Sequence, residues 1–280
     1  MNNIYTATIS VITATYNRPE GLKRAIKTLQ NQTYWNYQHI IIDDGAIYDV
    51  KHIVEKYGDN RIKLICHSVN RGYLHAKNTG LDNIDGDWFT FLDDDDELYP
   101  NALETLINVH YKIDNKINAV SCNCIDTSTN AFSGFGVSKD QYLDLRTIFS
   151  KLHGEHWGIT HTSLLGKDRF NPILKSDGSL WYKINLRAKR YYIHKALRIF
   201  HTDGKDRTTL VNKKLSYDER YAIAKERLKE SAYLNMIKKY DKKKFIKVCL
   251  YGLIYSRIKK DIQSTKKYLE YLFNLAITKK

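Results

Sequence analysis

The sequence is poor in residues that break or cross-link a chain. Its 280 residues include 3 prolines and 14 glycines, which leaves little material for flexible linkers, and it contains neither a fixed-period repeat nor a low-complexity tract. The four cysteines, Cys66, Cys122, Cys124 and Cys249, form no C-x-x-C pair. This spacing indicates neither a zinc knuckle nor a disulfide framework, and it suits a reducing cytosol.

Long hydrophobic runs and glycine-rich loops are also missing. No stretch approaches the roughly 20 apolar residues that cross a bilayer, and the short apolar run from Ile9 to Ala14, with no Lys or Arg before Arg18, is not typical of a secretory signal. We therefore expect a cytoplasmic protein. Neither G-x-G-x-x-G nor G-x-x-x-x-G-K-[ST] follows the first apolar run. The phosphates of a bound nucleotide are thus expected to be neutralised by a metal rather than wrapped by backbone amides.

Charge is distributed unevenly along the chain, whose net charge is +14. Residues 213–280 carry 19 Lys and Arg against 7 Asp and Glu, whereas residues 1–212 carry 26 against 24. We place a boundary near Asn212, between a nearly neutral body and a strongly basic tail. With 42% hydrophobic residues, the chain can bury a sizeable core, as one domain with an appendage or as two domains.

Two hydrophobic patterns alternate through the first 120 residues. Short apolar runs predict buried strands at 6–16, 39–43, 61–67 and 88–92. Helical periodicity lies between and after them, at 22–29, 49–57, 72–83 and 100–112. This order predicts an α/β fold with a mostly parallel sheet and helices on both faces. Ligands of such sheets bind at the carboxyl ends of the strands.

A run of acidic residues follows the fourth predicted strand. The stretch WFTFLDDDDELYP at 88–100 places Asp93 to Asp96 in succession, with Glu97 behind them. Two carboxylates about 6 Å apart repel by roughly 3 kcal/mol at an effective dielectric of about 20, so the run is either fully solvated or held for a cation. The clusters TYN, DDG and DDDD each end a different predicted strand and converge on one sheet edge. We therefore favour a site for a hard divalent metal, Mn²⁺ or Mg²⁺.

Two segments resemble a known family. ISVITATYNRPEGLKRAIKTLQNQTYWNYQHIIIDDG and NRGYLHAKNTGLDNIDGDWFTFLDDDDELYP are similar to the nucleotide-sugar domain of family 2 inverting glycosyltransferases, which have the GT-A fold. The resemblance is strong over residues 7–112, weaker over 154–203 and absent from the tail. It implies a GT-A domain at 1–212, with a nucleotide-sugar half at 1–112 and an acceptor half at 113–212, followed by a basic helical tail at 213–280.

The same resemblance implies contacts with a nucleoside diphosphate sugar donor. The positions that match nucleotide contacts of the family are Thr13, Tyr16, Asn17, Asp44, Arg71, Lys77, Asp93 and Asp94. Within this set, Asp44 is implied to recognise the base. UDP is the expected nucleotide, although DDGA, TATYN and a Lys in place of the usual Arg depart from the family pattern and leave the donor open.

The resemblance also implies a metal site. Asp95 of the D-x-D pair is implied as a metal ligand and His201 as a further one, the alternative being that His201 is an ordinary polar loop residue. If strand alternation persists past the fourth strand, Asp93 and Asp95 share one side, while Asp94 and Asp96 face backbone amides or solvent.

Inverting transfer requires a general base for the acceptor hydroxyl. Asp177 lies where the family has an acidic residue before an aromatic helix, so it is the implied base; the alternative is that it only caps the helix. His156, Trp157 and Trp181 are possible acceptor contacts, because aromatic faces pack on apolar ridges of sugars. Trp181 is equally suited to the core.

The implied function is metal-dependent transfer of one hexosyl or N-acetylhexosaminyl group to a hydroxyl of a glycan or lipid-linked acceptor in bacterial surface polysaccharide, lipopolysaccharide or capsule synthesis. The family's Q-x-x-R-W signature of processive enzymes is absent; residues 184–190 read INLRAKR instead. The alternatives are a sugar-nucleotide pyrophosphorylase-like enzyme, which would want a Gly-rich basic signature after the first strand, and a non-catalytic module that retains the nucleotide fold.

The basic tail lacks proline and reads as helical throughout. Its segment FIKVCLYGLIYSRIKK is apolar and aromatic, with DKKK before it. Two interpretations stay open: an interfacial helix on an anionic membrane surface, which would make the protein peripheral on the cytoplasmic face, or a helical bundle that packs on the body or forms a homo-oligomer. Nucleic acid is not an expected partner, because the tail has no recognisable binding motif.

Overall fold

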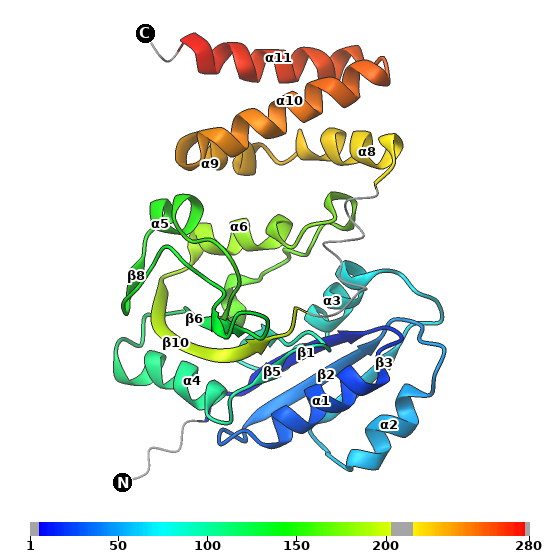
Figure 1. The fold of residues 1–280 in the computed structure, drawn as a ribbon, viewed down its shortest axis with the longest axis vertical. Helices are drawn as coiled ribbons and strands as arrows, with labels where there is room; N and C mark the ends of the chain where they lie inside the picture. The colour runs from blue at the N-terminus through cyan, green and yellow to red at the C-terminus, as the bar shows by residue number, and fades with distance from the viewer. Residues whose placement is uncertain (1–5, 203–214, 278–280) are drawn as a thin grey trace.

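The computed structural model describes residues 6–202 and 215–277 (Figure 1). One sheet runs through the body in the order β3-β2-β1-β4-β9-β6-β10-β5. Its first half consists of β1 (Ile9–Thr15), β2 (Tyr37–Asp43), β3 (Ile62–Cys66) and β4 (Trp88–Phe91). All pairings among these four strands are parallel. The four predicted strands and their carboxyl-end edge are therefore confirmed.

The second half of the sheet is mixed, unlike the mostly parallel sheet that we predicted. Its strands are β5 (Glu97–Leu98), β6 (Ala119–Asp126), β7 (Ala131–Phe132), β8 (Gln141–Leu143), β9 (His156–His161) and β10 (Arg190–Phe200). β9 lies antiparallel between β4 and β6, and only β6 and β10 pair in parallel. The loop after β8 and the short helix α5 (Leu145–Ser150) bring the chain back as β9, so no crossover helix sets a parallel direction here.

Helices cover both faces of the sheet. On one face lie α1 (Pro19–Gln30), α2 (Val50–Tyr57) and α4 (Ala102–Lys112), and on the other lie α3 (Tyr73–Leu81) and α6 (Gly178–Arg187) (Figure 1). β1 shows why: Ile9 and Val11 pack with α1 and α4, while Ile12 packs with α3 and α6. Alternate residues of a strand point to opposite faces, so a strand buried on both sides is apolar almost throughout. Two short 3₁₀ turns, Thr162–Leu164 and Pro172–Leu174, lead from β9 into α6.

Residues 215–277, the described part of the tail, fold as four helices stacked on the body: α8 (Tyr217–Arg227), α9 (Ser231–Tyr240), α10 (Lys242–Ile258) and α11 (Ile262–Ile277) (Figure 1). Their core includes Tyr182 of α6 and thus continues into the body. Gly252 lets α10 and α11 approach closely, because a Cβ there would lie 2.1 Å from the ring of Tyr268. The tail thus packs on the body, as the bundle interpretation expects, while attachment to a membrane or to a second copy stays a prediction. The predicted boundary at Asn212 lies outside the described residues.

Candidate active site

Three strand ends meet at one edge of the sheet, as the sequence predicts. The backbone amide of Asp44, just after β2, donates to the carbonyl oxygen of Thr15 at the end of β1. The Thr15 hydroxyl in turn donates to Oδ2 of Asp94, in the aspartate run after β4, at 2.9 Å. Residues from TYN, DDG and DDDD are thus within hydrogen-bonding distance of one another.

The aspartate run forms a turn rather than a continued strand. The amide of Asp96 donates to the carbonyl of Asp93 at 3.1 Å, which closes the turn. The side chains of Asp93 and Asp95 are 45% and 31% exposed, whereas Asp94 and Asp96 are buried. Asp93 and Asp95 therefore share the open side, as alternation predicts, although a turn and not strand pleating separates them from Asp94 and Asp96.

Cations of the chain itself balance the run. Nη1 of Arg18 lies 3.1 Å from Asp94 Oδ1 and 2.8 Å from Asp95 Oδ2. The buried Arg198 lies 3.5 Å from Asp96. Burial raises the pKa of Asp94 to about 7 and that of Asp96 to about 7, against the pull of these guanidinium groups. Our two alternatives, solvation or a bound cation, omitted this internal pairing.

Helix α1 holds the backbone of the run in place. Arg24 Nη2 donates to the carbonyl oxygen of Asp95 at 2.8 Å. Gly21 permits the close approach, because a Cβ at this position would lie 2.2 Å from the carbonyl oxygen of Asp94. The first two turns of α1 and the residue before it thus fix the position of Asp94 and Asp95.

Lys77 links the run to α6. Its ammonium, on α3, lies 3.1 Å from Asp93 Oδ1 and 3.3 Å from Asp177 Oδ2. Burial lowers the pKa of Lys77, but the charges of Asp93 and Asp177 outweigh it and raise the pKa above its ordinary value. The structure therefore brings together the Lys77, Asp93 and Asp177 of the sequence prediction, although 100 residues separate Lys77 from Asp177.

Asp177 does not act as a side-chain cap. It stands at the N-cap position of α6 but makes no capping hydrogen bond. Its Oδ1 is buried, and no described residue hydrogen-bonds to it. Tyr73 lies nearby: burial raises the pKa of its hydroxyl, and the charge of Asp177 raises it further. One carboxylate oxygen is thus held by Lys77 and the other is enclosed, while the side chain as a whole is 38% exposed.

Asp44 organises the loop before α3. Its carboxylate accepts hydrogen bonds from the backbone amides of Arg71 and Gly72 at 3.0 and 2.8 Å, and from His67 Nδ1 at 2.7 Å. Positive φ at Gly72 lets this loop turn into the helix. The side chain of Arg71 is exposed at the edge. A role for Asp44 in base recognition stays a prediction.

The predicted nucleoside contacts at the end of β1 differ in their surroundings. Tyr16 is 44% exposed, and Asn17, with a φ of 56°, accepts a hydrogen bond from the amide of Ile47. Thr13 is instead fully buried, and its hydroxyl lies 3.0 Å from Nε2 of His39 inside the sheet. This corrects the expectation for Thr13: it lies inside the sheet, two residues before the end of β1, and Thr15 at the strand end is the threonine that reaches the site.

Asp94 also needs correction as a nucleotide contact. Its side chain is 6% exposed, and both oxygens are occupied by Arg18 and Thr15. Asp94 therefore stabilises the turn of the aspartate run instead of facing a ligand. Sequence reasoning missed three residues that contact the aspartate run: Thr15, Arg18 and Arg24. For two of them a signal was available, because Thr15 is the threonine of the TYN cluster and Arg18 directly follows that cluster.

His201 lies beside the run but contacts Glu97. Its Nε2 is 2.9 Å from Glu97 Oε1, and its backbone amide donates to Asp96. The part of the chain that the structure describes has no group of three or more His, Cys, Asp or Glu placed to hold a metal. A metal role for His201 stays a prediction, and the ring would first have to leave Glu97.

Two exposed carboxylates nevertheless fit a hard divalent cation. Partial burial and the neighbouring charge of Asp93 raise the pKa of Asp95, opposed by Arg18, so a positive ion beside this pair would relieve their repulsion. Mg²⁺ and Mn²⁺ are commonly bound through one or two carboxylates, with phosphate and water oxygens completing the shell. Asp93 and Asp95 are the residues that would hold such an ion.

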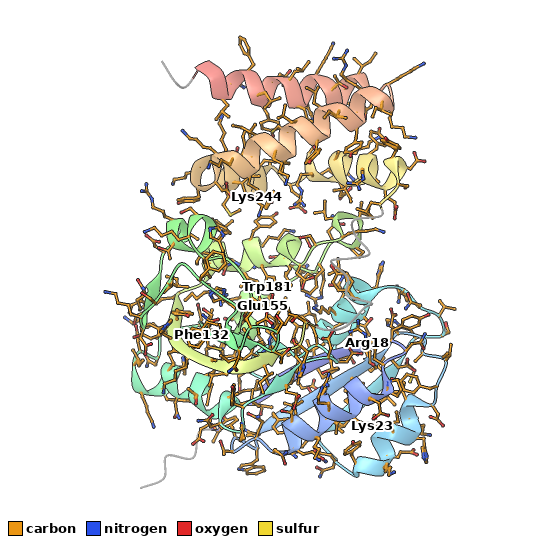
Figure 2. The ribbon with its side chains drawn as sticks, viewed as in Figure 1. Arg18, Lys23, Phe132, Glu155, Trp181 and Lys244 are labelled. Carbon is orange, nitrogen blue, oxygen red and sulfur yellow. The ribbon has the colours of Figure 1, made fainter. Side chains whose placement is uncertain are left out.

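The three aromatic acceptor candidates are less open than we expected. Trp157 is buried in the core under α4, with its Nε1 donating to the carbonyl of Phe91, so its ring faces are covered and it is not an acceptor platform. His156 packs edge-on against Tyr192, and burial lowers the pKa of its ring to about 4. Trp181 is half-buried and stacks on Phe89, with ring centroids 6.4 Å apart, which is the core alternative (Figure 2).

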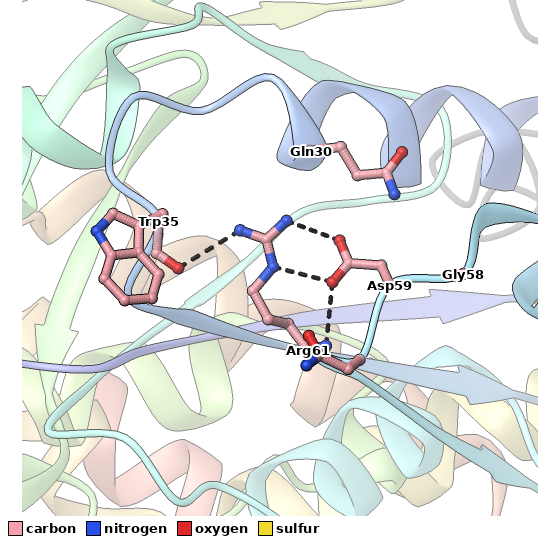
Figure 3. A pocket seen from close by; sticks show the side chains of 6 residues that line it. Gln30, Trp35, Gly58, Asp59 and Arg61 are labelled. Atoms are coloured by element: carbon pink, nitrogen blue, oxygen red, sulfur yellow. Dashed lines mark hydrogen bonds and ion pairs between the residues drawn. The ribbon is translucent and has the colours of Figure 1, made fainter.

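A pocket of about 610 Å³ lies at the opposite edge of the sheet, lined by Gln30, Trp35, Gly58, Asp59, Asn60 and Arg61. Figure 3 shows Arg61 paired with Asp59 and reaching the carbonyl of Trp35. These residues precede β2 and β3, whereas the aspartate run follows the carboxyl end of β4. The pocket is therefore separate from the candidate active site.

The half-parallel sheet, with acidic and basic side chains at its carboxyl edge, defines an α/β fold of the GT-A type. Residues 10–163 match the family described as glycosyl transferase family 2. The chain belongs to this family, and it is a glycosyltransferase.

Among curated relatives, the chain is 36% identical over 222 residues to a GalNAc(5)-diNAcBac-PP-undecaprenol beta-1,3-glucosyltransferase of Campylobacter jejuni, covering 75% of this chain and 69% of the relative. It is 27% identical over 176 residues to the UDP-Glc:alpha-D-GlcNAc-diphosphoundecaprenol beta-1,3-glucosyltransferase WfgD of Escherichia coli, covering 63% and 69%. An uncharacterized glycosyltransferase of Rickettsia prowazekii is 33% identical over 208 residues, covering 70% of this chain and 64% of the relative. The chain thus spans about two thirds of the length of these relatives.

Two solved structures share the fold. S. aureus TarS 1-349 in complex with UDP-GlcNAc aligns with a TM-score of 0.63 at 18% identity, covering 95% of this chain and 92% of that one. The mannosyltransferase PcManGT from Pyrobaculum calidifontis, in complex with GDP-Man and Mn²⁺, aligns with a TM-score of 0.57 at 17% identity, covering 98% and 76%. At such low identity these likenesses bear on the fold alone.

Proposed function

We propose that the chain transfers one hexosyl group, with inversion, from a UDP-sugar to a hydroxyl of a lipid-linked glycan during bacterial surface polysaccharide synthesis. The observation that carries the proposal is the Asp93–Lys77–Asp177 bridge. In this bridge, Asp93 of the aspartate run and Asp177, the one acidic residue at positions 174–190, both lie beside the ammonium group of Lys77. An inverting transfer needs such a pair, a donor-side carboxylate and a base within reach of it.

In this mechanism Asp177 is the general base. Lys77 holds its carboxylate in place, and this carboxylate, whose side chain is 38% exposed, accepts the proton of the acceptor hydroxyl as that oxygen attacks the anomeric carbon. The buried ammonium keeps the carboxylate in one orientation, which limits the entropic cost of reaching the reactive geometry. The nucleoside diphosphate leaves from the opposite side of the sugar.

On the donor side, Asp93 and Asp95 are the residues that would hold Mn²⁺ or Mg²⁺. When bound, the ion would act as a Lewis acid that neutralises charge on the leaving diphosphate. The ion pair with Arg18 keeps the carboxylate of Asp95 oriented. The exposed Tyr16 and Arg71 flank the space where the nucleoside would bind.

The acceptor class is proposed from the relatives. The names of the Campylobacter and Escherichia enzymes specify undecaprenol-diphosphate-linked acceptors and glucosyl transfer. The family assignment argues against the pyrophosphorylase-like alternative and the non-catalytic module. Addition of a single sugar rests on the missing Q-x-x-R-W signature and stays a prediction, as does peripheral attachment to the cytoplasmic face of the membrane.

Hydrolysis of a panel of nucleoside diphosphate sugars, with and without Mn²⁺, tests the proposal. We expect turnover of a UDP-sugar that depends on the added ion. No turnover of any donor, together with no metal-dependent binding of a nucleotide, would overturn it.

A further inference from the structure

Helix α10 carries two apolar faces, only one of which is used by the bundle. Phe245, Cys249, Gly252 and Ser256 are buried at helical spacing against the other tail helices. On the roughly opposite side, Ile246, Leu250, Ile254 and Ile258 follow one another at four-residue intervals. These four side chains are 37–52% exposed, so the bundle leaves a continuous apolar stripe uncovered.

Basic residues border this stripe. α10 contains Lys242, Lys243, Lys244, Lys247 and Arg257 and no acidic residue. By helical spacing, Lys243, Lys247 and Arg257 share the side of the stripe. Lys244 differs: its ammonium lies 6.0 Å from the ring centroid of Tyr233 in α9, which directs it toward the bundle (Figure 2).

α11 repeats the arrangement. Ile262, Leu269 and Phe273 are 49–70% exposed at positions i, i+7 and i+11, and Lys266 lies between them on the same side of the helix. Tyr268 is fully buried on the other side. Two consecutive helices thus each use one face for the bundle core and expose a second, apolar and basic face.

We propose that the exposed face of α10 and α11 is a membrane-docking surface for anionic phospholipids. Charge complementarity favours lipid over a protein partner: the face of α10 combines exposed aliphatic side chains with basic residues and no acidic one, which is the composition of helices that lie in the plane of an anionic interface. No described helix is long and apolar enough to span a membrane. At about 1.5 Å per residue, the apolar stripe from Ile246 to Ile258 is roughly 18 Å long.

Docking through this surface would also serve the proposed reaction. That benefit rests on the proposed function, whereas the docking itself does not. The tail stacks on α6, whose first residue follows Asp177. Ion pairs between Lys175 and Glu219, at 2.7 Å, and a hydrogen bond from Asn171 to Glu226, at 3.0 Å, fasten the two parts. Docking through the tail would hold the base at a fixed distance from the lipid surface, where a lipid-linked acceptor is located.

Co-sedimentation of the full chain with vesicles tests the proposal. We expect binding to vesicles of phosphatidylcholine with about one third phosphatidylglycerol, weakening as salt rises, and none to pure phosphatidylcholine. The double substitution Leu250→Gln with Ile254→Gln should weaken binding by at least about tenfold. Lys243→Gln with Lys247→Gln should weaken it by roughly 25-fold, since each basic residue near the surface contributes roughly fivefold.

The matched control is Phe135→Gln, a change of a 61% exposed apolar residue on the body, which should bind vesicles like the unmodified chain. Thermal unfolding and donor hydrolysis should be unchanged in all variants, so that failure of docking is separable from failure of the transferase proposal. Equal binding by the Leu250/Ile254 variant, or no binding by the unmodified chain, overturns the proposal. Conversion of a dimer to a monomer by that variant, without vesicle binding, would instead assign the face to a second copy.

Discussion

At the carboxyl edge of the sheet, each aspartate of the run lies against a cation of the chain: Lys77 beside Asp93, Arg18 beside Asp94 and Asp95, and Arg198 beside Asp96. On α10 the five basic residues form no ion pair with any residue that the structure describes. The body therefore balances concentrated charge locally, and α10 leaves it unbalanced at the surface.

This difference separates two uses of charge. Paired and half-buried groups keep fixed positions, which suits a site where atoms must meet within about 3 Å. Unpaired groups on a solvated helix act over about 10 Å at moderate salt and attract an extended surface of opposite charge. We therefore assign chemistry to the sheet edge and docking to the tail.

Within the aspartate run, a large effect is expected at the exposed carboxylate of Asp95. Asp95→Ala should lower metal-dependent turnover by at least about 100-fold, because it removes one of two carboxylates available to the ion. Asp96→Asn should be milder, since Asp96 is buried against Arg198 and the amide of His201. Initial rates of donor hydrolysis at saturating Mn²⁺ measure both. An equal loss in the two variants would contradict the distinction between exposed and buried aspartates.

Removal of a pairing cation should destabilise the body. Arg18→Ala should lower the free energy of unfolding by about 2 kcal/mol, because it leaves the buried Asp94 without its charged partner. Lys23→Ala is the control on the same helix: Lys23 pairs only with the exposed Glu20, and no measurable change is expected (Figure 2). Urea unfolding of both variants checks this, and equal stabilities would show that the run does not need Arg18.

A smaller effect, a pH dependence of the free energy of unfolding, should arise in the body, which contains all 10 histidines of the chain. Burial lowers the pKa of His39 to about 3, so this ring stays neutral when folded but takes up a proton when unfolded below about pH 6.5. Its stabilising contribution is therefore present above pH 6.5 and is lost as pH falls. Between pH 7 and 5.5 the loss should be about 1 kcal/mol.

The test is the pH dependence of urea unfolding in His39→Gln, with the exposed His52→Gln as control. The slope between pH 7 and 5.5 should flatten in His39→Gln and persist in His52→Gln. An unchanged slope in His39→Gln would mean that the ring titrates normally in the folded protein.

Local patterns predicted the first half of the fold well. The strands at 9–15, 37–43, 62–66 and 88–91 and the helices between them follow from periodicity that each segment contains within itself. The antiparallel insertion of β9 did not follow, because strand direction in a sheet depends on how the chain returns and not on the pattern of the strand.

The site shows the same division. The convergence of TYN, DDG and DDDD could be predicted from strand order alone. The cations that balance the aspartates could not, since Arg18 and Arg198 lie 76 and roughly 100 positions from their partners and no local rule pairs them. Thr13 and Trp157 were misplaced because residue type and motif position do not give burial: Thr13 lies inside the sheet, two residues before the end of β1, and Trp157 lies in the core with α4.

The most direct test of the account is Asp177→Asn, measured for both transfer and UDP binding. Asn keeps the shape of the side chain but cannot take a proton, so transfer should fall by about 1,000-fold while UDP affinity stays within about threefold of the unmodified enzyme. Transfer that survives this change would contradict the assignment of Asp177 as the general base and, with it, the role given to the Asp93–Lys77–Asp177 bridge.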